Sequence, residues 1–396
     1  MNMGRSADYT IQGFLYQFNK TLLELLKSSD NDVVTVEGII EDIEIVTPAI
    51  TKAIQCKYHE TQAKFVVSSL YKPLLQMMQH FLLNKAGKVE YQLFVHFPNT
   101  LNIEITAANL QNAISSSDKT LKPYVKGLKG NIDLAAFLKA LRVDVGPAFR
   151  TLATEVSAML QMSGISAADV EILAYPNAIQ IIADLSIQHN VKNRQITKLQ
   201  LLERLRRIKS TAISHWTLAL QSKDKLLLSR RKQLKTNLAK NARSRFFVLY
   251  AESLQDFDQQ IVLFIKGYLD KFHFKAAHVS TPIFFLSVDQ ERFDAIAVRL
   301  VHKEVAINDG RVAGTFNQAL FLRDPMVIKE KREFLLRLAR WETHQHLLAT
   351  SKADDLFLLG QSEIGHLNTD DINVEKLASD SFVEINYMMG LSDVNK

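Results

Sequence analysis

The first hundred residues carry two helical stretches and several strand-like apolar runs. Apolar residues recur with helical spacing from Ile11 to Leu26 and again over about 68–83, which predicts two amphipathic helices. Runs rich in apolar and β-branched residues lie at 33–45, 53–58 and 89–96. A turn near Gly38 can divide the first of these runs. The pattern therefore predicts a helix, three strands, a helix and a strand, in that order.

Helical spacing dominates the middle of the chain. Stretches with this spacing cover 134–141, 149–162, 167–173 and 176–189. Gly146-Pro147 interrupts the pattern, and Thr197 can cap a further helix that runs to about Ser210. We expect this helical region to begin in the polar stretch around Ser115.

Short apolar strands alternate with helices in the last third of the chain. Strands are expected at 246–250, 282–288, 318–322, 356–359 and 382–386, and helices at 258–272, 290–302 and 326–348. This alternation predicts a layered α/β unit. The sequence thus predicts an α/β protein with a first domain, a helical domain, a basic linker helix and a regulatory or partner-binding α/β domain. These parts span 1–115, 116–222, 223–245 and 246–396.

Composition narrows the classes of protein that fit. The chain has 396 residues, of which 47% are hydrophobic, so it can hold two or three domains. Cys56 is the single cysteine, which excludes an intramolecular disulfide framework and fits a reducing compartment. No run of 18 uncharged apolar residues occurs, and we expect a cytoplasmic protein without a membrane span. The phosphate-binding, dinucleotide-binding and nucleophile-elbow glycine motifs are missing too.

Asp42, Gln55 and Lys57 form the most informative group of polar residues. Side chains alternate between the faces of a strand, so Gln55 and Lys57 share one face while Cys56 packs on the other. Asp42 can bind a divalent cation, and Gln55 can offer its carbonyl oxygen to the cation or to a bound water. Lys57 can polarise a scissile phosphate or orient the attacking water. These residue types suit metal-dependent hydrolysis of phosphodiesters.

Other polar residues near this group allow more than one interpretation. Strict strand alternation places Glu44 on the face of Asp42 and Glu41 on the other face, although a turn near Gly38 can change that register. His59 shares the face of Lys57, where it can contact DNA or metal-bound water, or can be a polar residue at a strand end. Gln17 can assist the site or can be a buried amide that is hydrogen-bonded within the core.

The N-terminal motifs resemble those of a known nuclease superfamily. They are Gly13-Phe14-x-Tyr16-Gln17, Glu37, Glu41-Asp42-Ile43 and Ile54-Gln55-x-Lys57. Together they resemble the N-terminal nuclease of bacterial antiviral effectors in the PD-(D/E)XK superfamily. The likeness is to CBASS-associated double-stranded DNA endonucleases and to nuclease subunits paired with helicases or NTPases. It covers about residues 5–100 and extends weakly to about 220. The third motif of that superfamily is often Glu-X-Lys, and here Gln55 stands in place of the glutamate.

The resemblance implies a restriction-endonuclease-like core that cuts DNA with Mg²⁺ or Mn²⁺. It implies that Asp42, Gln55, Lys57 and Glu37 form the catalytic site, and that Asp42, Glu37 and Gln55 hold the metal. Gln17, which belongs to these motifs, would be an auxiliary residue, and His59 would be another because of its position just beyond Lys57 on the strand. The implied partner is a helicase-like or NTPase subunit of an antiviral defence system, with a prokaryotic Argonaute as the alternative. A homo-oligomer is also compatible with the resemblance.

A basic segment runs from Lys223 to Arg245. It contains nine Lys or Arg residues against one acid, and leucines lie among them at near-helical spacing. Either this predicted helix is a solvated face, or it binds phosphates or docks a partner. The residues assigned to nucleic-acid binding are Arg230, Arg231, Lys232 and Lys235. The net charge of +6 is compatible with nucleic acid but does not establish it.

The competing class of function is non-enzymatic. A basic adaptor with a degenerate nuclease fold could recruit another protein to DNA without cutting it. The two classes differ in whether Asp42, Gln55 and Lys57 converge in the folded chain.

Overall fold

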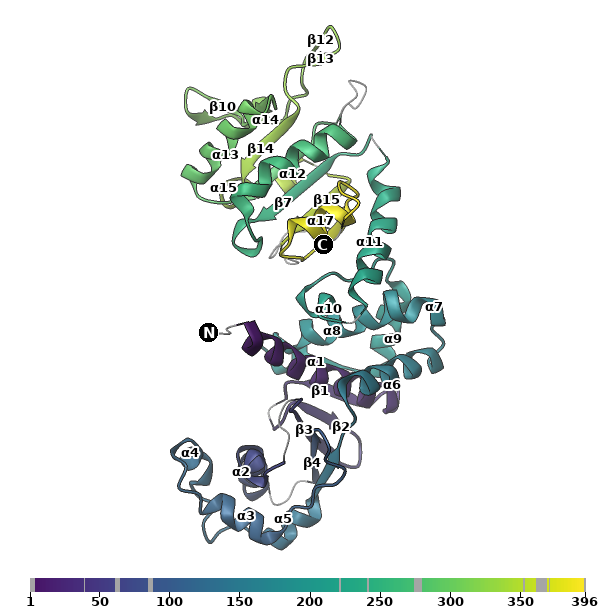
Figure 1. The fold of residues 1–396 in the computed structure, drawn as a ribbon, viewed down its shortest axis with the longest axis vertical. Coiled ribbons are helices and arrows are strands. Elements are labelled where there is room, and N and C mark those ends of the chain that lie inside the picture. Colours follow the sequence, from purple (N-terminus) through teal and green to yellow (C-terminus); the bar gives the residue numbers. More distant parts are fainter. Residues whose placement is uncertain are drawn as a thin grey trace. The chain divides into compact units, whose positions relative to one another are not determined.

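The chain folds into two compact units, residues 1–209 and residues 210–396 (Figure 1). The computed structural model describes residues 4–38, 40–60, 65–84, 88–220, 222–240, 242–273, 280–351, 353–360, 369 and 371–394. The first unit includes the expected first domain and most of the expected helical domain. The second includes the basic helix and the expected C-terminal α/β domain. No helix in the described ranges is long and apolar enough to cross a membrane.

The first unit is built on a six-stranded mixed sheet. Its first elements are α1 (Gly4–Lys27), β1 (Val33–Val36), β2 (Ile43–Val46), β3 (Thr51–Tyr58), η1 (Val67–Leu70), α2 (Tyr71–Leu83) and β4 (Val89–His96). This confirms the predicted order of helix, three strands, helix and strand, with the first apolar run folded into a hairpin. The strand order is β5-β4-β3-β2-β1-β6, with β5 at Leu141–Val145 and β6 at Gln195–Ile196. Strands β3, β4 and β5 are parallel, and the other pairs are antiparallel.

Helices cover both faces of this sheet. Helix α1 packs on the face that carries Ile54 and Phe94, where the Lys20 ammonium lies 4.2 Å from the centre of the Phe94 ring. Helix α2 packs on the opposite face, which carries Leu93 and Val95. The α2 layer continues through α3 (Ala107–Ile114), η2 (Lys119–Leu121), α4 (Lys122–Val125) and α5 (Leu134–Ala140).

The remaining helices of the first unit are α6 (Phe149–Met162), α7 (Ala167–Asp169), the π-helical turn η3 (Val170–Ala174), α8 (Tyr175–Ser186), η4 (Val191–Arg194) and α9 (Lys198–Arg207). Of these, α6 and α8 pack against α1, and the others pack against these helices or their neighbours. The Tyr175 hydroxyl of α8 donates a hydrogen bond of 2.9 Å to the Asn19 side chain of α1. Thr197 caps α9 together with Gln200, as predicted. These contacts confirm a helix-rich middle region.

The second unit is built on a parallel six-stranded sheet of order β16-β15-β7-β8-β14-β9. Its strands are β7 (Arg245–Tyr250), β8 (Ile283–Ser287), β9 (Ile307–Asn308), β14 (Leu336–Arg340), β15 (Asp355–Leu359) and β16 (Asn373–Leu377). Its helices include α10 (His215–Leu218), α11 (Lys223–Leu238), η5 (Ala251–Ser253), α12 (Phe257–Phe272), α13 (Gln290–His302) and α17 (Phe382–Met388). Apolar side chains from both sheet faces enter separate cores. That burial explains why the central strands are apolar without alternation.

Three predictions for the second unit are wrong. Residues 318–322 form helix α14 (Gln318–Leu322), because the Asn317 side chain caps its first turn at the Leu320 amide. Residues 382–386 lie in helix α17, whose buried apolar side chains, Phe382, Ile385 and Met388, recur every three residues. Residues 326–348 are not one helix. They form the hairpin β12 (Val327–Ile328) and β13 (Lys331–Arg332), strand β14, and the short helices α15 (Trp341–His344) and α16 (Leu347–Thr350).

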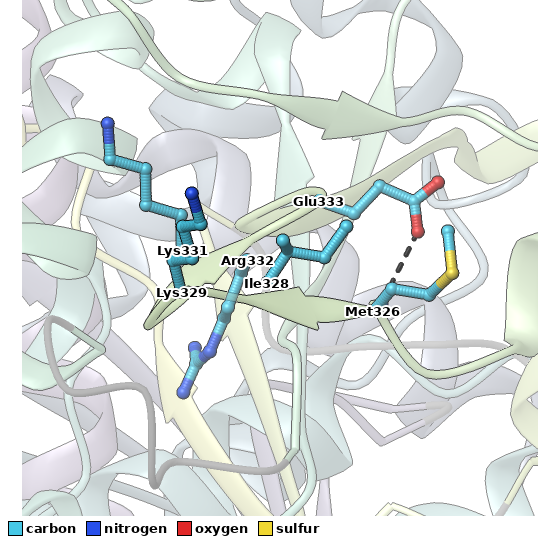
Figure 2. Close-up of a pocket in the computed structure, with 6 residues that line it drawn as sticks. All are labelled: Met326, Ile328, Lys329, Lys331, Arg332 and Glu333. Atoms are coloured by element: carbon cyan, nitrogen blue, oxygen red, sulfur yellow. Dashed lines mark hydrogen bonds between the residues drawn. The ribbon is translucent and has the colours of Figure 1, made fainter.

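Two hairpins project from the second unit. One joins β10 (Arg311–Val312) to β11 (Thr315–Phe316), and the other is β12–β13. Lys329 and Glu330 turn the second hairpin with positive φ angles of 48° and 64°. An open pocket of about 450 Å³ lies on this hairpin (Figure 2). Met326, Ile328 and four charged residues line it.

Candidate active site

Pairing of β2 with β3 brings Asp42 to Gln55. Ile43 pairs with Ile54, so Asp42, one residue before β2, lies opposite Gln55. The Asp42 Oδ2 atom accepts a hydrogen bond of 2.9 Å from the Cys56 backbone amide and another from the Gln55 side-chain amide. The structure thus places two of the three predicted core residues in direct contact, although they are 13 positions apart in the chain.

Lys57 lies on the same sheet face as Gln55. Gln55 pairs with Leu93 and Lys57 with Val95, and both partners point into the core under α2. Lys57 lowers the pKa of Asp42 through space, without a direct ion pair between them. Asp42 and Gln55 are therefore in contact, and Lys57 lies on the same sheet face as Gln55, whereas Cys56 is buried on the other face.

The site is largely shielded from solvent and rich in carboxyl groups. Burial raises the pKa of Asp42 to about 6, although the Cys56 amide and Lys57 oppose this rise. Burial also raises the pKa of the neighbouring Glu41 to about 8, and repulsion from Asp42 adds to it. Carboxyl groups in such surroundings favour either a proton or a nearby cation.

Glu37 is held at the end of β1 by residues from two other elements. Its backbone has a left-handed φ of 49°, and its amide donates a hydrogen bond of 2.8 Å to the Asp42 carbonyl across the turn. The Gln17 side chain of α1 donates a 2.6 Å hydrogen bond to Glu37 Oε1. Arg194 donates a 2.7 Å hydrogen bond to the Glu37 carbonyl oxygen. Gln17 thus positions Glu37, whose charge in turn raises the pKa of Asp42.

His59 lies just beyond Lys57, at the end of β3. Its ring stacks on Phe97 with ring centres 4.6 Å apart, and its backbone amide bonds to the His96 carbonyl oxygen. Burial lowers the pKa of His59, and Lys57 lowers it further. His59 is therefore a neighbour of Lys57 on the candidate site's face and is also part of the aromatic packing there.

Sequence reasoning missed two residues at this site. Strand alternation placed Glu41 away from Asp42, yet Glu41 lies in the turn before β2, where alternation does not apply, and it interacts with both Asp42 and Lys57. Arg194, the second residue, contacts Glu37 although it lies 157 positions from it in the chain. No local pattern signals Arg194, whereas the turn at Gly38 was a signal that Glu41 could face either way.

The assignment of Arg230 to nucleic-acid binding does not fit the structure. Helix α11 forms as predicted, but Arg230 is only 2% exposed and its guanidinium pairs with Glu375. Arg230 falls in the buried stripe of the helix, four residues from Leu226 and from Leu234. Arg231 pairs with Asp393 at 2.5 Å. Only Lys232 and Lys235 of the four assigned residues remain exposed without an ion pair to a described residue, and their role stays a prediction.

A second basic surface lies in the first unit. The segment 119–130 contains four exposed lysines and no acid. They are Lys119, Lys122, Lys126 and Lys129. The Gln79 side chain of α2 connects this segment to α2 by donating a hydrogen bond of 3.2 Å to the Pro123 carbonyl oxygen. The lysine loop, residues 119–130, therefore belongs to the helical layer that covers the face of Gln55 and Lys57.

The donors at the site suit a hard divalent cation. Asp42 and Gln55 offer oxygen atoms, the ligands that Mg²⁺ and Mn²⁺ prefer. The buried Oε1 atom of Glu41 has no hydrogen-bond donor within the described chain. No three Asp, Glu, His or Cys side chains among the described residues gather as a ready metal cage. A cation bound here would have few protein ligands, and Mg²⁺ is a cation that is commonly held in that way.

Comparison with known proteins leaves function to be inferred from this geometry. No protein-family model matches the chain, and no curated protein matches it either. The arrangement of Asp42, Gln55 and Lys57 is therefore the main basis for assigning a function to this chain.

Proposed function

We propose that this chain is a metal-dependent DNA endonuclease of the PD-(D/E)XK type. The observation that carries the proposal is the convergence of Asp42, Gln55 and Lys57 on adjacent strands, within a core of the predicted αβββαβ order. A degenerate nuclease fold has no need to keep an acid, an amide and a lysine together in a partly buried site. The same convergence favours the enzyme over a non-catalytic adaptor.

Each residue has a role that follows from its chemistry. Asp42 would hold Mg²⁺ or Mn²⁺, and Gln55 would complete its coordination. The Gln55 amide nitrogen faces Asp42 here, and rotation of the amide by half a turn exchanges nitrogen for oxygen at that position. Glu37, oriented by Gln17, adds negative charge nearby and is the further metal ligand that the family resemblance implies. A bound divalent cation would stabilise charge on the phosphate oxygens during cleavage.

Lys57 would stabilise the transition state. It is half-buried and has no direct ion pair with a described residue, so its ammonium group is available to a phosphate oxygen or to the attacking water. In partly desolvated surroundings a fixed positive charge acts more strongly than in bulk water. His59, next to Lys57, can contact the same substrate.

DNA binding would rest on charge. The four lysines of the lysine loop present positive charge on the α2 layer without a neighbouring acid in the segment. Lys232 and Lys235 of α11 form a separate basic surface in the second unit. Such contacts bind phosphates irrespective of sequence.

The proposed biological setting comes from the family resemblance. The chain would act in the cytoplasm as the nuclease subunit of a prokaryotic antiviral defence system. A helicase-like or NTPase partner would control it, or alternatively a short prokaryotic Argonaute. The second unit, with its own parallel sheet, would receive the partner or a signal.

The proposal is tested by incubating the purified chain with supercoiled plasmid and linear DNA. We expect nicking or linearisation with Mg²⁺ or Mn²⁺ and none with EDTA, with and without the partner encoded beside it. An RNA of equal length serves as the substrate control. DNA binding without any cleavage under all of these metal conditions would support the adaptor function instead.

A further inference from the structure

Glu41 is a buried carboxylate with an unused oxygen. Its side chain is 7% exposed, and the Oε1 atom has no hydrogen-bond donor among the described residues. Its neighbour Glu44 is buried too, but Glu44 Oε1 accepts a hydrogen bond from the Ile40 amide. An unpaired buried carboxylate costs free energy, because it has lost its water without gaining a partner.

The unused oxygen belongs to the candidate site. Glu41 directly precedes Asp42, and its charge interacts with those of Asp42 and Lys57. It also interacts with Tyr91 of β4, which points into the core under α2. Glu41 is therefore buried within electrostatic range of Asp42, Lys57 and Tyr91.

The composition of the site explains what such an oxygen could bind. Gln55 is neutral and leaves Asp42 as the one carboxylate among the three core residues. Glu37 is already engaged through its Oε1 by Gln17. Divalent cations such as Mg²⁺ are usually held by one or two carboxylates together with neutral oxygens. A second carboxylate would thus balance the charge of the ion, and Glu41 is the buried one without a hydrogen-bond donor among the described residues.

We propose that Glu41, in preference to the Glu37 that the family resemblance implies, is the second metal-binding carboxylate and takes the place of the acid that Gln55 lacks. This rests on the proposed function, since it assigns a further ligand to the same metal. It also accounts for a carboxylate that packing alone would not keep at this position. The ion expected is Mg²⁺ or Mn²⁺, because all the donors are oxygen atoms.

The test is Mn²⁺ binding by the full chain, measured by calorimetric titration and by the metal-induced rise in thermal stability. The variants are Glu41→Gln, Asp42→Asn and, as the matched control, Glu44→Gln. The control removes a charge three residues away but keeps an oxygen to accept the Ile40 hydrogen bond. We expect the Kd for Mn²⁺ to rise at least tenfold in Glu41→Gln and in Asp42→Asn, and to change much less in Glu44→Gln.

The possible results distinguish failure of the role of Glu41 from failure of the metal-dependent function. Wild-type affinity in Glu41→Gln together with lost affinity in Asp42→Asn would overturn the role of Glu41 and leave the metal site in place. A wild-type chain that binds no Mn²⁺ would overturn the metal-dependent function itself. Unfolding in EDTA shows whether each variant is folded. If Glu41→Gln does not fold, Glu41→Asp replaces it in the test. This variant keeps the charge on a shorter side chain and should still bind Mn²⁺, but more weakly than wild type. Wild-type affinity in Glu41→Asp would then count against direct ligation.

Discussion

At the residue scale, the raised pKa values of Asp42 and Glu41 predict how stability depends on pH. Both carboxyl groups hold protons more tightly in the folded chain than in the unfolded one, where carboxyl pKa values are about 4. The folded state therefore binds more protons between about pH 4 and pH 8, and its free energy of unfolding should fall as the pH rises through that window.

Denaturant unfolding in EDTA at pH 5, 6.5 and 8 tests this dependence. Glu41→Gln removes one of the two groups, so its stability relative to wild type should increase from pH 5 to pH 8. Groups that do not interact with Glu41 titrate equally in both proteins and cancel in the comparison. Asp42 loses the repulsion from Glu41 in the variant, which lowers its pKa and changes the difference in the same direction. A difference that is constant over this range would contradict the raised pKa of Glu41.

The same residues mark what sequence could predict at the site. Asp42, Gln55 and Lys57 were predictable, because strand alternation and a short hairpin fix their relative positions. The orientation of Glu41 was not, since it depends on the backbone of the turn after Glu37. Arg194 was not predictable either, because a two-residue strand brings it across from the far end of the unit.

At the element scale, α11 is held to the second unit by a buried ion pair. Arg230 pairs with Glu375 of β16, and removing one partner would leave the other charge buried and unpaired. We expect Arg230→Gln to lower the free energy of unfolding by about 3–5 kcal/mol. Lys232→Gln, on the exposed face of the same helix, should change it by no more than about 0.5 kcal/mol. Equal stability of the two variants would show that Arg230 is not buried in solution.

The lysine loop predicts a second effect at this scale, on DNA binding. Replacing Lys122, Lys126 and Lys129 with Gln should weaken DNA affinity and reduce its salt dependence. The log–log slope should fall by about 0.9 for each phosphate that the variant no longer neutralises. Affinity measured at several salt concentrations gives this slope. The double variant Lys232→Gln and Lys235→Gln, measured in parallel, decides whether α11 contributes as well. An unchanged slope in the loop variant would exclude the loop from the DNA-binding surface.

Helices and strands were predictable where the regular spacing of apolar residues extended over many positions or where the residues at their ends were characteristic. Helix α13 matches its predicted bounds, and so do α6 and strand β4. Short apolar runs such as 382–386 fit a strand and a buried helix equally well, and only packing decides between them. Strand β5 directly follows α5 and pairs with β4, which is about 50 positions earlier in the chain. The residues around β5 alone do not indicate this pairing.

At the scale of the whole molecule, each unit has its own hydrophobic core. The core under α2 lies within residues 1–209, and the two cores around the parallel sheet lie within residues 210–396. The candidate site is built entirely from the first unit. This division suits a nuclease unit joined to a unit that receives a partner or signal, the arrangement that the family resemblance implies.

The most direct test of the central claim is the rate of plasmid cleavage by Lys57→Ala in saturating Mn²⁺. Lys57 is only half-buried and forms no ion pair with a described residue, so the variant should fold and bind DNA. Its cleavage should nevertheless fall about 100-fold or more, because a fixed positive charge is missing at the transition state. Lys27→Ala, which removes an exposed lysine at the end of α1, should cut like the wild type. Near-wild-type cleavage by a folded Lys57→Ala protein would contradict the assignment of this site as catalytic.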